Sequence, residues 1–255
     1  GESIMSILLI LLLNLAVGAC IGLTGIAGFL LPMFYTGFLG MPAAESLALS
    51  SSAFLISGLL GAVTYYKEGN LEIRPAAVMS AGSLLGALAG VKVNLLIPEE
   101  MMQIILYLVV LTSGISILLR KDGADGSGAG PEDCTAGRKM FYFLLGIVTG
   151  AVCAASGAGG PVLVMPLLTL LGFPAHTAVG MSLFNSVFIA LPAAGGYLWS
   201  SAGNRGTLLL LIPVLLAHGI GVAAGRRNAK RINQILLKRI VAVGSIAVAL
   251  FRLFL

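Results

Sequence analysis

Two glycine-rich breaks, each with a hydroxyl residue, are the features of this sequence that could do chemistry. The stronger break lies inside a very apolar stretch and consists of Ser156, Gly157, Gly159 and Gly160. Glycine lets a ligand approach the backbone closely. A helix that begins after such a break presents unpaired N–H groups and the positive end of its dipole. Together with a hydroxyl donor, these groups are typical of a site for a small anion.

A weaker copy of the break occurs earlier in the chain. At one constant offset, the copy aligns Thr24, Gly25 and Gly28 with Ser156, Gly157 and Gly160. The same offset aligns residues 39–43, Leu-Gly-Met-Pro-Ala, with residues 171–175, Leu-Gly-Phe-Pro-Ala. Some matches would arise by chance among 34 glycines, but this proline-containing run is hard to explain that way. A match at a fixed period indicates an internal repeat, so the chain is predicted to contain two related halves.

A second polar cluster lies about two helical turns beyond Pro42, and its counterpart lies at the same place beyond Pro174. Ser50 and Ser182 match at the repeat offset, and Asn185 should share a helix face with Ser182. These side chains are candidates for contact with a ligand held at the breaks. The alternative is that the hydroxyls bond to carbonyls of their own helix.

His218 is an ionisable residue inside an apolar segment. Such a residue within the membrane is a functional hypothesis by default, here a proton relay; a neutral, hydrogen-bonded histidine is the alternative. Lys92 lies near a predicted helix end, where snorkelling accounts for it. No other Lys, Arg, Asp or Glu lies well inside a predicted span. A small anion would therefore be held by helix dipoles and neutral donors.

The composition predicts a polytopic helical membrane protein. The chain is 58% hydrophobic and 10% charged, whereas soluble domains carry roughly 25% charged residues. Apolar runs such as 4–21 and 208–224 approach the roughly 20 residues that cross a bilayer as a helix. The net charge of +5 is better explained by loops on one side of the membrane than by nucleic acid.

Nothing in the sequence supports an enzyme. Cys20, Cys134 and Cys153 show neither metal-ligand spacing nor an even-numbered disulfide framework. The His, Asp and Ser residues form no triad-like or metal-like set. We therefore expect no catalytic residue, no metal and no cofactor.

The short segments 29–39 and 162–171 decide the topology. At about 1.5 Å per residue, neither can cross a bilayer core of about 30 Å. If each turns back as a half-helix, most of the 15 basic residues lie on one side, which the positive-inside rule assigns to the cytoplasm. The two halves then have opposite orientations, and both termini are extracytoplasmic.

The predicted fold is therefore an all-α polytopic membrane protein built from two inverted-topology repeats. Each repeat has about four spanning helices and a half-helix after its glycine-rich break, the last span being 234–255. Residues 1–120 form the first repeat, residues 121–138 a cytoplasmic linker and residues 139–255 the second repeat. Inverted repeats with broken helices are typical of secondary transporters, whose substrate lies between the halves near the midplane.

At these motifs the sequence resembles the TauE/SafE family, the sulfite and sulfonate exporters also called TSUP transporters. The matching stretches are the break with its apolar-proline continuation, the Leu-Gly-Phe-Pro run, a small-Ser helix start and a glycine-rich helix ending in a basic residue: 157–166, 171–174, 178–183 and 219–227. The first copy departs from the pattern, since it has Ile26 and Ala27 between its glycines. The second half should therefore contribute more to the site.

The resemblance implies transport of sulfite, thiosulfate or organosulfonates across the cytoplasmic membrane. We expect a secondary transporter that exports such anions, with proton coupling as its candidate drive. The alternatives are a passive anion channel, an importer of another small anion, or a membrane scaffold. The expected partners are the anion and the lipid bilayer, with no nucleic acid, and the sequence leaves open a homo-oligomer.

Overall fold

The computed structural model describes residues 2–25, 27–119, 136–202 and 205–228, with short further pieces between 236 and 250. Within these residues the chain is helical and contains no strand. The helices are α1 (Glu2–Thr24), α2 (Leu30–Gly37), α3 (Ala43–Lys67), α4 (Ile73–Leu96), α5 (Glu99–Leu119), α6 (Ala136–Ser156), α7 (Gly160–Leu170), α8 (Ala175–Ser200) and α9 (Arg205–Asn228). The predicted all-α class is confirmed.

Six of the described helices are long and apolar enough to cross a membrane, namely α1, α3, α4, α6, α8 and α9. Their exposed faces carry large apolar side chains, such as Leu12 on α1 and Leu209 on α9. Apolar helix faces of this kind are stable in lipid, where every backbone group is satisfied inside the helix. The chain is a multi-pass membrane protein.

The predicted half-helices are confirmed. α1 ends at Thr24 and α2 has 8 residues, while α6 ends at Ser156 and α7 has 11 residues. At about 1.5 Å per residue, both are too short to cross the bilayer core. Most of the predicted linker 121–138 and of the last predicted span lies outside the described residues.

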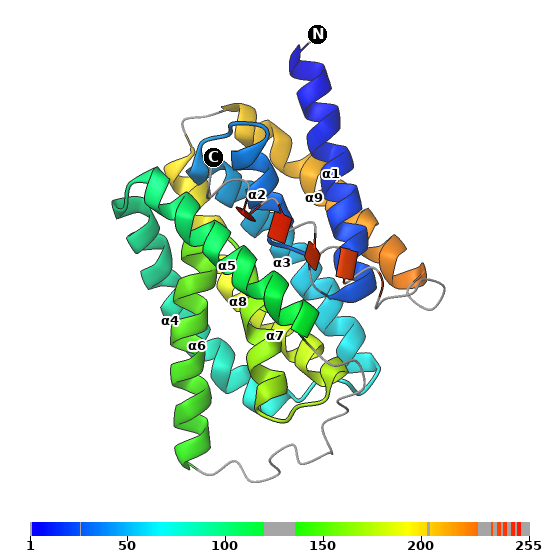
Figure 1. Ribbon diagram of the computed structural model, residues 1–255, viewed down its shortest axis with the longest axis vertical. Coiled ribbons are helices and arrows are strands. Elements are labelled where there is room, and N and C mark those ends of the chain that lie inside the picture. The colour runs from blue at the N-terminus through cyan, green and yellow to red at the C-terminus, as the bar shows by residue number, and fades with distance from the viewer. Residues whose placement is uncertain are drawn as a thin grey trace.

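The long helices pack in pairs that cross between the two halves. α1 packs along α9, α4 packs along α6, and α3 packs along α8. Exchange of the two predicted halves would turn the first pair into the second, because the repeat offset of the sequence aligns α1 with α6 and α4 with α9. In Figure 1, α1 runs down from the N-terminus at the top, whereas α6 rises from the bottom of the view.

Glycines form the seams of the first two pairs. A Cβ added to Gly146 of α6 would lie 2.0 Å from the Met79 carbonyl oxygen of α4, and one on Gly221 of α9 would lie 2.2 Å from the Leu15 carbonyl oxygen of α1. Small residues let backbones approach closely where lipid gives no hydrophobic drive for association. The seams therefore hold the two halves together.

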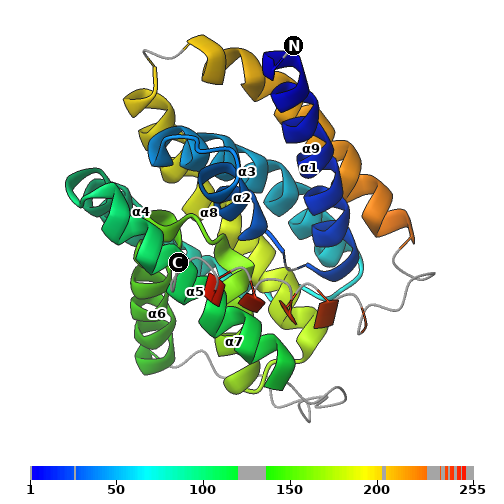
Figure 2. The same ribbon diagram turned by 45° about the horizontal axis from the view of Figure 1, so that its top comes forward.

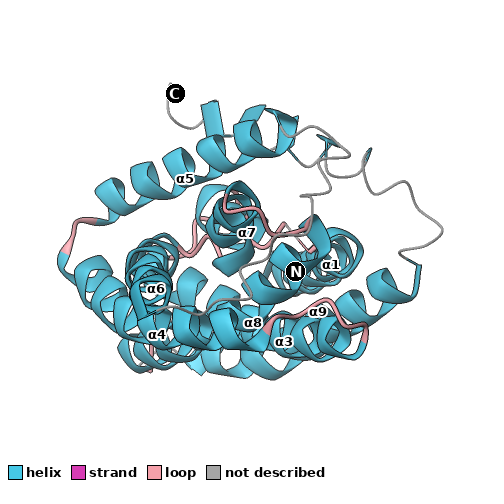
Figure 3. Cartoon of the chain, turned by 90° about the horizontal axis from the view of Figure 1, so that it is seen from below, coloured by secondary structure: helices cyan, strands magenta, loops and turns pink. Residues whose placement is uncertain are grey.

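The short helices lie inside the resulting arrangement. Seen from below, α4, α8, α3 and α9 follow one another in a row, with α6, α7 and α1 on one side of it and α5 outermost on that side (Figure 3). α2 contacts α3 and α1, and Figure 2 shows it in front of α3 and beside α1. The long helices thus surround the breaks that precede α2 and α7.

We predict that Gly146→Val strongly destabilises the protein. Its side chain would collide with backbone atoms of Met79 and Ser83, and overpacking of this kind typically lowers stability by about 1–3 kcal/mol. Gly195→Ala is the matched control, since nothing lies within 4 Å of its added Cβ. Thermal unfolding in detergent, followed by circular dichroism, should give a lower midpoint for Gly146→Val alone. Equal midpoints would show that α4 and α6 can move apart without loss of stability.

Candidate functional site

The two breaks lie against one small cavity, called the break cavity below. The first break contributes Gly25 and Gly28 to its wall, and the second contributes Ala158 and Gly159. The full lining consists of Ile21, Gly25, Gly28, Phe54, Ser57, Ala158, Gly159, Pro161, Val162, Leu183 and Ser186. Its volume of about 10 Å³ is close to the minimum that holds one water molecule.

The ring of Phe54, on α3, occupies the space between the breaks. A Cβ on Gly28 would lie 2.9 Å from Cε1 of this ring, and one on Gly159 would lie 3.5 Å from Cε2. The backbone of each break therefore approaches one edge of the same ring. Glycine is needed at Gly28 because any side chain there would displace the ring, and Phe54 stands where a ligand would meet both breaks.

The second break is built by left-handed glycines. Gly157 has φ +69° and Gly159 has φ +80°, a region that glycine enters without steric penalty. The Gly157 N–H closes α6 by donating to the Cys153 carbonyl at 2.9 Å. The Ser156 hydroxyl donates to the Val152 carbonyl at 2.7 Å, and its oxygen accepts from the Ala158 N–H at 3.3 Å. Ser156 thus stabilises both the helix end and the break.

The first break has the same plan with a strained residue. Gly25 has φ +72°, its N–H donates to the Ile21 carbonyl at 2.7 Å, and the Thr24 hydroxyl donates to the Cys20 carbonyl at 2.8 Å. Ala27, the counterpart of Gly159, is fully buried at φ 124°. An alanine at this φ stores strain of the kind that persists only where the surroundings enforce it. The first break therefore departs from the second because it has a strained alanine where the second has a glycine.

Several predicted site residues are buried but do not line the break cavity. The Ser50 hydroxyl donates to the Ser46 carbonyl at 2.7 Å, and the Ser182 hydroxyl donates to the Val179 carbonyl at 2.9 Å. Both hydroxyls thus bond to carbonyls of their own helix, as the alternative interpretation of the sequence expects. Gly160 packs against Ser186 and the Ser182 carbonyl, so it joins the start of α7 to α8.

Asn185 is fully buried, and neither its amide nitrogen nor its oxygen has a hydrogen-bond partner. A buried polar group without a partner lowers stability by about 1–3 kcal/mol. Asn185 also lies outside the wall of the break cavity. Its amide is therefore a polar group that this arrangement of helices leaves unsatisfied.

His218 is fully buried on α9, beside the backbone of Asn14. Neither ring nitrogen has a hydrogen-bond partner of good geometry, and the Asn14 side-chain oxygen also has none. The Asn14 side-chain nitrogen donates to the Tyr35 hydroxyl of α2 and, at 2.8 Å, to the Ile10 carbonyl. A buried polar group thus lies between α1, α2 and α9, apart from the break cavity.

A larger cavity, called the vestibule below, adjoins the break cavity. Its volume is about 160 Å³, and it is lined by Ile21, Gly22, Ser57, Leu60, Gly61, Thr64, Tyr65, Leu183, Val222, Ala223 and Arg226. Ile21, Ser57 and Leu183 line both cavities. The vestibule has room for on the order of ten water molecules, and it lies between the end of α9 and the break cavity.

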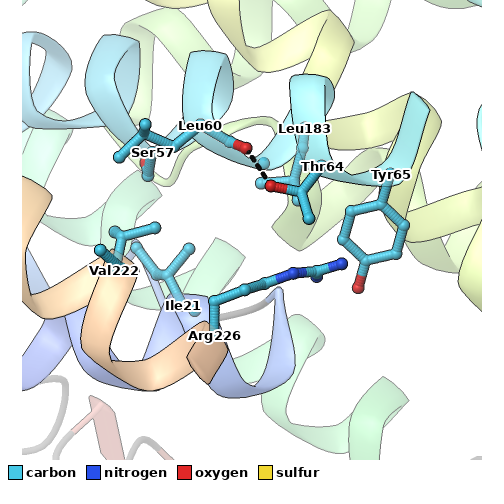
Figure 4. A pocket seen from close by; sticks show the side chains of 11 residues that line it. Ile21, Ser57, Leu60, Thr64, Tyr65, Leu183, Val222 and Arg226 are labelled. Carbon is cyan, nitrogen blue, oxygen red and sulfur yellow. Dashed lines mark hydrogen bonds between the residues drawn. The ribbon is translucent and has the colours of Figure 1, made fainter. Parts of the chain in front are cut away.

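Arg226 lines the vestibule but is not among the predicted site residues, since the sequence shows it only within the basic end of the glycine-rich helix at 219–227. Its guanidinium lies 4.4 Å from the centre of the Tyr65 ring and 2.5 Å from the Glu68 carboxylate. Figure 4 shows its side chain extending across the vestibule towards Tyr65. The available signal was its place directly after the glycine seam of α9.

Apart from Arg226, no charged residue of the described part of the chain lines either cavity. Burial raises the pKa of the Glu72 carboxyl, which lies in the same loop as Glu68 but lines neither cavity. Within the described part of the chain, no three His, Cys, Asp or Glu side chains gather so that they could hold a metal ion.

We predict that Gly157→Ala destabilises the protein more than Gly172→Ala. Both positions have positive φ, +69° and +92°, so each alanine adds strain of about 1–2 kcal/mol. An added Cβ on Gly157 would also lie 2.1 Å from Cδ2 of Leu47, whereas Gly172 has open space. The melting midpoints of the two variants measure the difference. Unfolding is detected by the reaction of a thiol dye with Cys153, which is buried in the folded protein. Equal decreases in the melting midpoint would mean that the Leu47 side chain moves aside without loss of stability.

Comparison with known proteins agrees with this architecture. The family model described as "Sulfite exporter TauE/SafE" matches residues 8–252. The "Probable membrane transporter protein YdhB" of Bacillus subtilis (strain 168) is 24% identical over 254 residues, which cover 97% of this chain and 100% of the relative. A "Probable membrane transporter protein" of Haemophilus influenzae is 26% identical over 215 residues, 78% of this chain and 76% of the relative. No solved structure matches. Because the family model spans nearly the whole chain, the chain belongs to the TauE/SafE family of membrane transporters.

Proposed function

We propose that the protein is a secondary transporter that exports small sulfur-containing anions, such as sulfite, thiosulfate or an organosulfonate, across the cell membrane. The observation that carries the proposal is the break cavity, where a glycine break from each half lies against one space. The family description supports the sulfur anion. The substrate would lie between the breaks, held by Thr24, Gly25 and Gly28 on one side and by Ser156, Gly157, Gly159 and Gly160 on the other.

Neutral donors are sufficient for such a ligand. Each hydrogen bond to a charged partner contributes roughly 1.5–3 kcal/mol, so several together offset the desolvation of a small anion. The start of α7 directs its dipole towards the cavity and adds a favourable field. No strong ion pair has to break on release, which suits a carrier that must both bind and let go.

The anion needs more room than the described arrangement offers. A cavity of about 10 Å³ holds about one water, and the Phe54 ring fills the space between the breaks. We infer that Phe54 moves when the substrate binds. The Asn185 amide, which has no partner, and the Ser182 hydroxyl, which bonds within α8, would then become candidates for contact with the anion in the rearranged state.

Alternating access between two inverted repeats would supply that rearrangement. The reciprocal packing of α1 on α9 and of α6 on α4 supports a pseudo-two-fold relation between the halves. The opposite directions of α1 and α6 in Figure 1 support its inverted form. In this proposal the cross-half seams are the surfaces on which the halves rock.

The positive-inside rule gives the orientation. The Arg226–Glu68 pair brings the end of α9 beside the end of α3, so Lys67, Arg226 and Arg227 lie at one end of the molecule. We assign this end and the linker 121–138 to the cytoplasm and both termini to the other side. The vestibule would then open towards the cytoplasm, as export requires.

Flux of isotope-labelled thiosulfate and of sulfite into proteoliposomes tests the function. We expect saturable flux, and we expect Ser156→Ala to raise the KM about tenfold if one hydrogen bond to the anion is lost, at about 1.4 kcal/mol per tenfold. Thr169→Ala is the matched control, because its hydroxyl also bonds carbonyls of its own helix, at 2.8 and 3.1 Å, but at the far end of α7. Flux that never saturates would favour a passive channel. Equal KM values for the two variants would exclude the break as the anion site.

His218→Gln tests proton coupling. An imidazole changes its protonation near neutral pH, whereas glutamine cannot, so we expect the variant to lose stimulation by a pH gradient and to keep anion exchange without one. His176→Gln is the matched control, since His176 is exposed at the start of α8. The same flux assay, run with and without a pH gradient, measures both. Unchanged stimulation in His218→Gln would leave His218 a structural residue.

A further inference from the structure

Arg226 occupies a position where its charge is directed at the substrate path. Among the described residues that line the vestibule, Arg226 alone carries a full charge. The vestibule lies directly beside the break cavity, and the two share Ile21, Ser57 and Leu183 in their walls. An anion that approaches the breaks through this space therefore passes the guanidinium first.

The present partners of Arg226 leave it ready for another anion. Tyr65 covers one face of the guanidinium at 4.4 Å, and such stacking fixes the plane of the group. Glu68 supplies the negative charge at 2.5 Å. The Arg226 side chain is 24% exposed and the Glu68 side chain 49%, so the carboxylate can turn out into water while the guanidinium stays in place.

The other half of the protein shows what the fold requires at this position. Gly221 and Gly225 of α9 pack on Leu15 and Ala19 of α1. The offset that aligns the breaks also aligns Leu15 with Ile147 and Ala19 with Ala151. The counterparts of the two α9 glycines are therefore the α4 glycines that pack on Ile147 and Ala151, which are Gly86 and Gly90.

The residue after Gly225 is Arg226, whereas the residue after Gly90 is Val91. Val91 is buried and packs against Gly196, next to Tyr197, the counterpart of Tyr65. The Tyr197 hydroxyl donates to the Ala154 carbonyl at 2.9 Å. In the first half the apolar Val91 fills this position. Packing therefore does not require an arginine at the equivalent position in the second half.

We propose that Arg226 is an entry site for the transported oxyanion and that Glu68 is a tethered competitor which occupies the guanidinium until the anion arrives. Arginine matches the geometry, because its planar fork can donate two parallel hydrogen bonds to an oxyanion. Binding of the anion exchanges one charged partner for another, so the guanidinium is never left unpaired in a partly apolar space. The return of Glu68 then releases the anion towards the breaks or back to the water.

This inference rests on the proposed function and makes a distinct prediction for the kinetics. Removal of the guanidinium in Arg226→Gln should raise the KM for thiosulfate and sulfite by ten- to a hundredfold when the anion is added at the vestibule face, since charge-assisted bonds contribute roughly 1.5–3 kcal/mol. The KM from the opposite face should not change. Glu68→Gln should lower the KM at the vestibule face and slow turnover, because it removes the competitor.

Arg227→Gln is the matched control. Arg227 is the next residue of the same helix, carries the same charge and lines neither cavity. We expect its KM to equal that of the unmodified protein. Arg226→Lys should have an intermediate KM, since lysine keeps the charge and loses the fork.

The outcomes separate this inference from the proposed function. Absence of sulfite and thiosulfate flux in the unmodified protein would overturn both. Normal flux in the unmodified protein, with equal KM values in Arg226→Gln and Arg227→Gln, would overturn the entry site alone. If Arg226→Gln does not fold, Glu68→Gln decides, because a KM that is unchanged or raised at the vestibule face contradicts a tethered competitor.

Discussion

Unpaired backbone groups at the two helix breaks are the constraint on which the rest of this structure depends. In lipid each unsatisfied N–H or C=O costs several kcal/mol, so a broken helix is stable only where protein surrounds it. Gly25 and Gly157 return their N–H groups to the preceding helix turn. Around them, α3 and α8 lie side by side, and the glycine seams bring α1 to α9 and α6 to α4. The enclosure of the two breaks thus requires the surrounding helices to pack closely.

The parts of this fold that depend on local chemistry could be predicted from the sequence. Glycines with a hydroxyl neighbour predicted where α1 and α6 end, and the apolar lengths predicted short helices after them. The parts that depend on tertiary packing could not be predicted. Nothing local to Phe54 indicates that its ring reaches both breaks, and the charge of Arg226 says nothing about the direction of its side chain.

The two predicted halves differ most around the two cavities. The second break has Gly159 at positive φ, whereas the first has the strained Ala27. Beside the tyrosines, one half presents Arg226 and the other presents Val91. A symmetric carrier would meet its ligand equally from both sides of the membrane. These differences give the surroundings of the two breaks unequal chemistry, while α1 on α9 and α6 on α4 pack in the same way.

The pairing of α1 with α9 has a consequence for biosynthesis. α1 is made before the other described helices, but the helix that covers Gly18 and Gly22 begins at Arg205. During translation the glycine face of α1 can contact only lipid, the insertion machinery or earlier helices, and its break lacks its final enclosure. Insertion of α1 therefore precedes its packing on α9 by at least the time needed to synthesise the residues between the two helices. Until α9 is made, α1 would be present in the membrane as an unpaired helix with a polar, glycine-rich end, a state that membrane quality control could recognise.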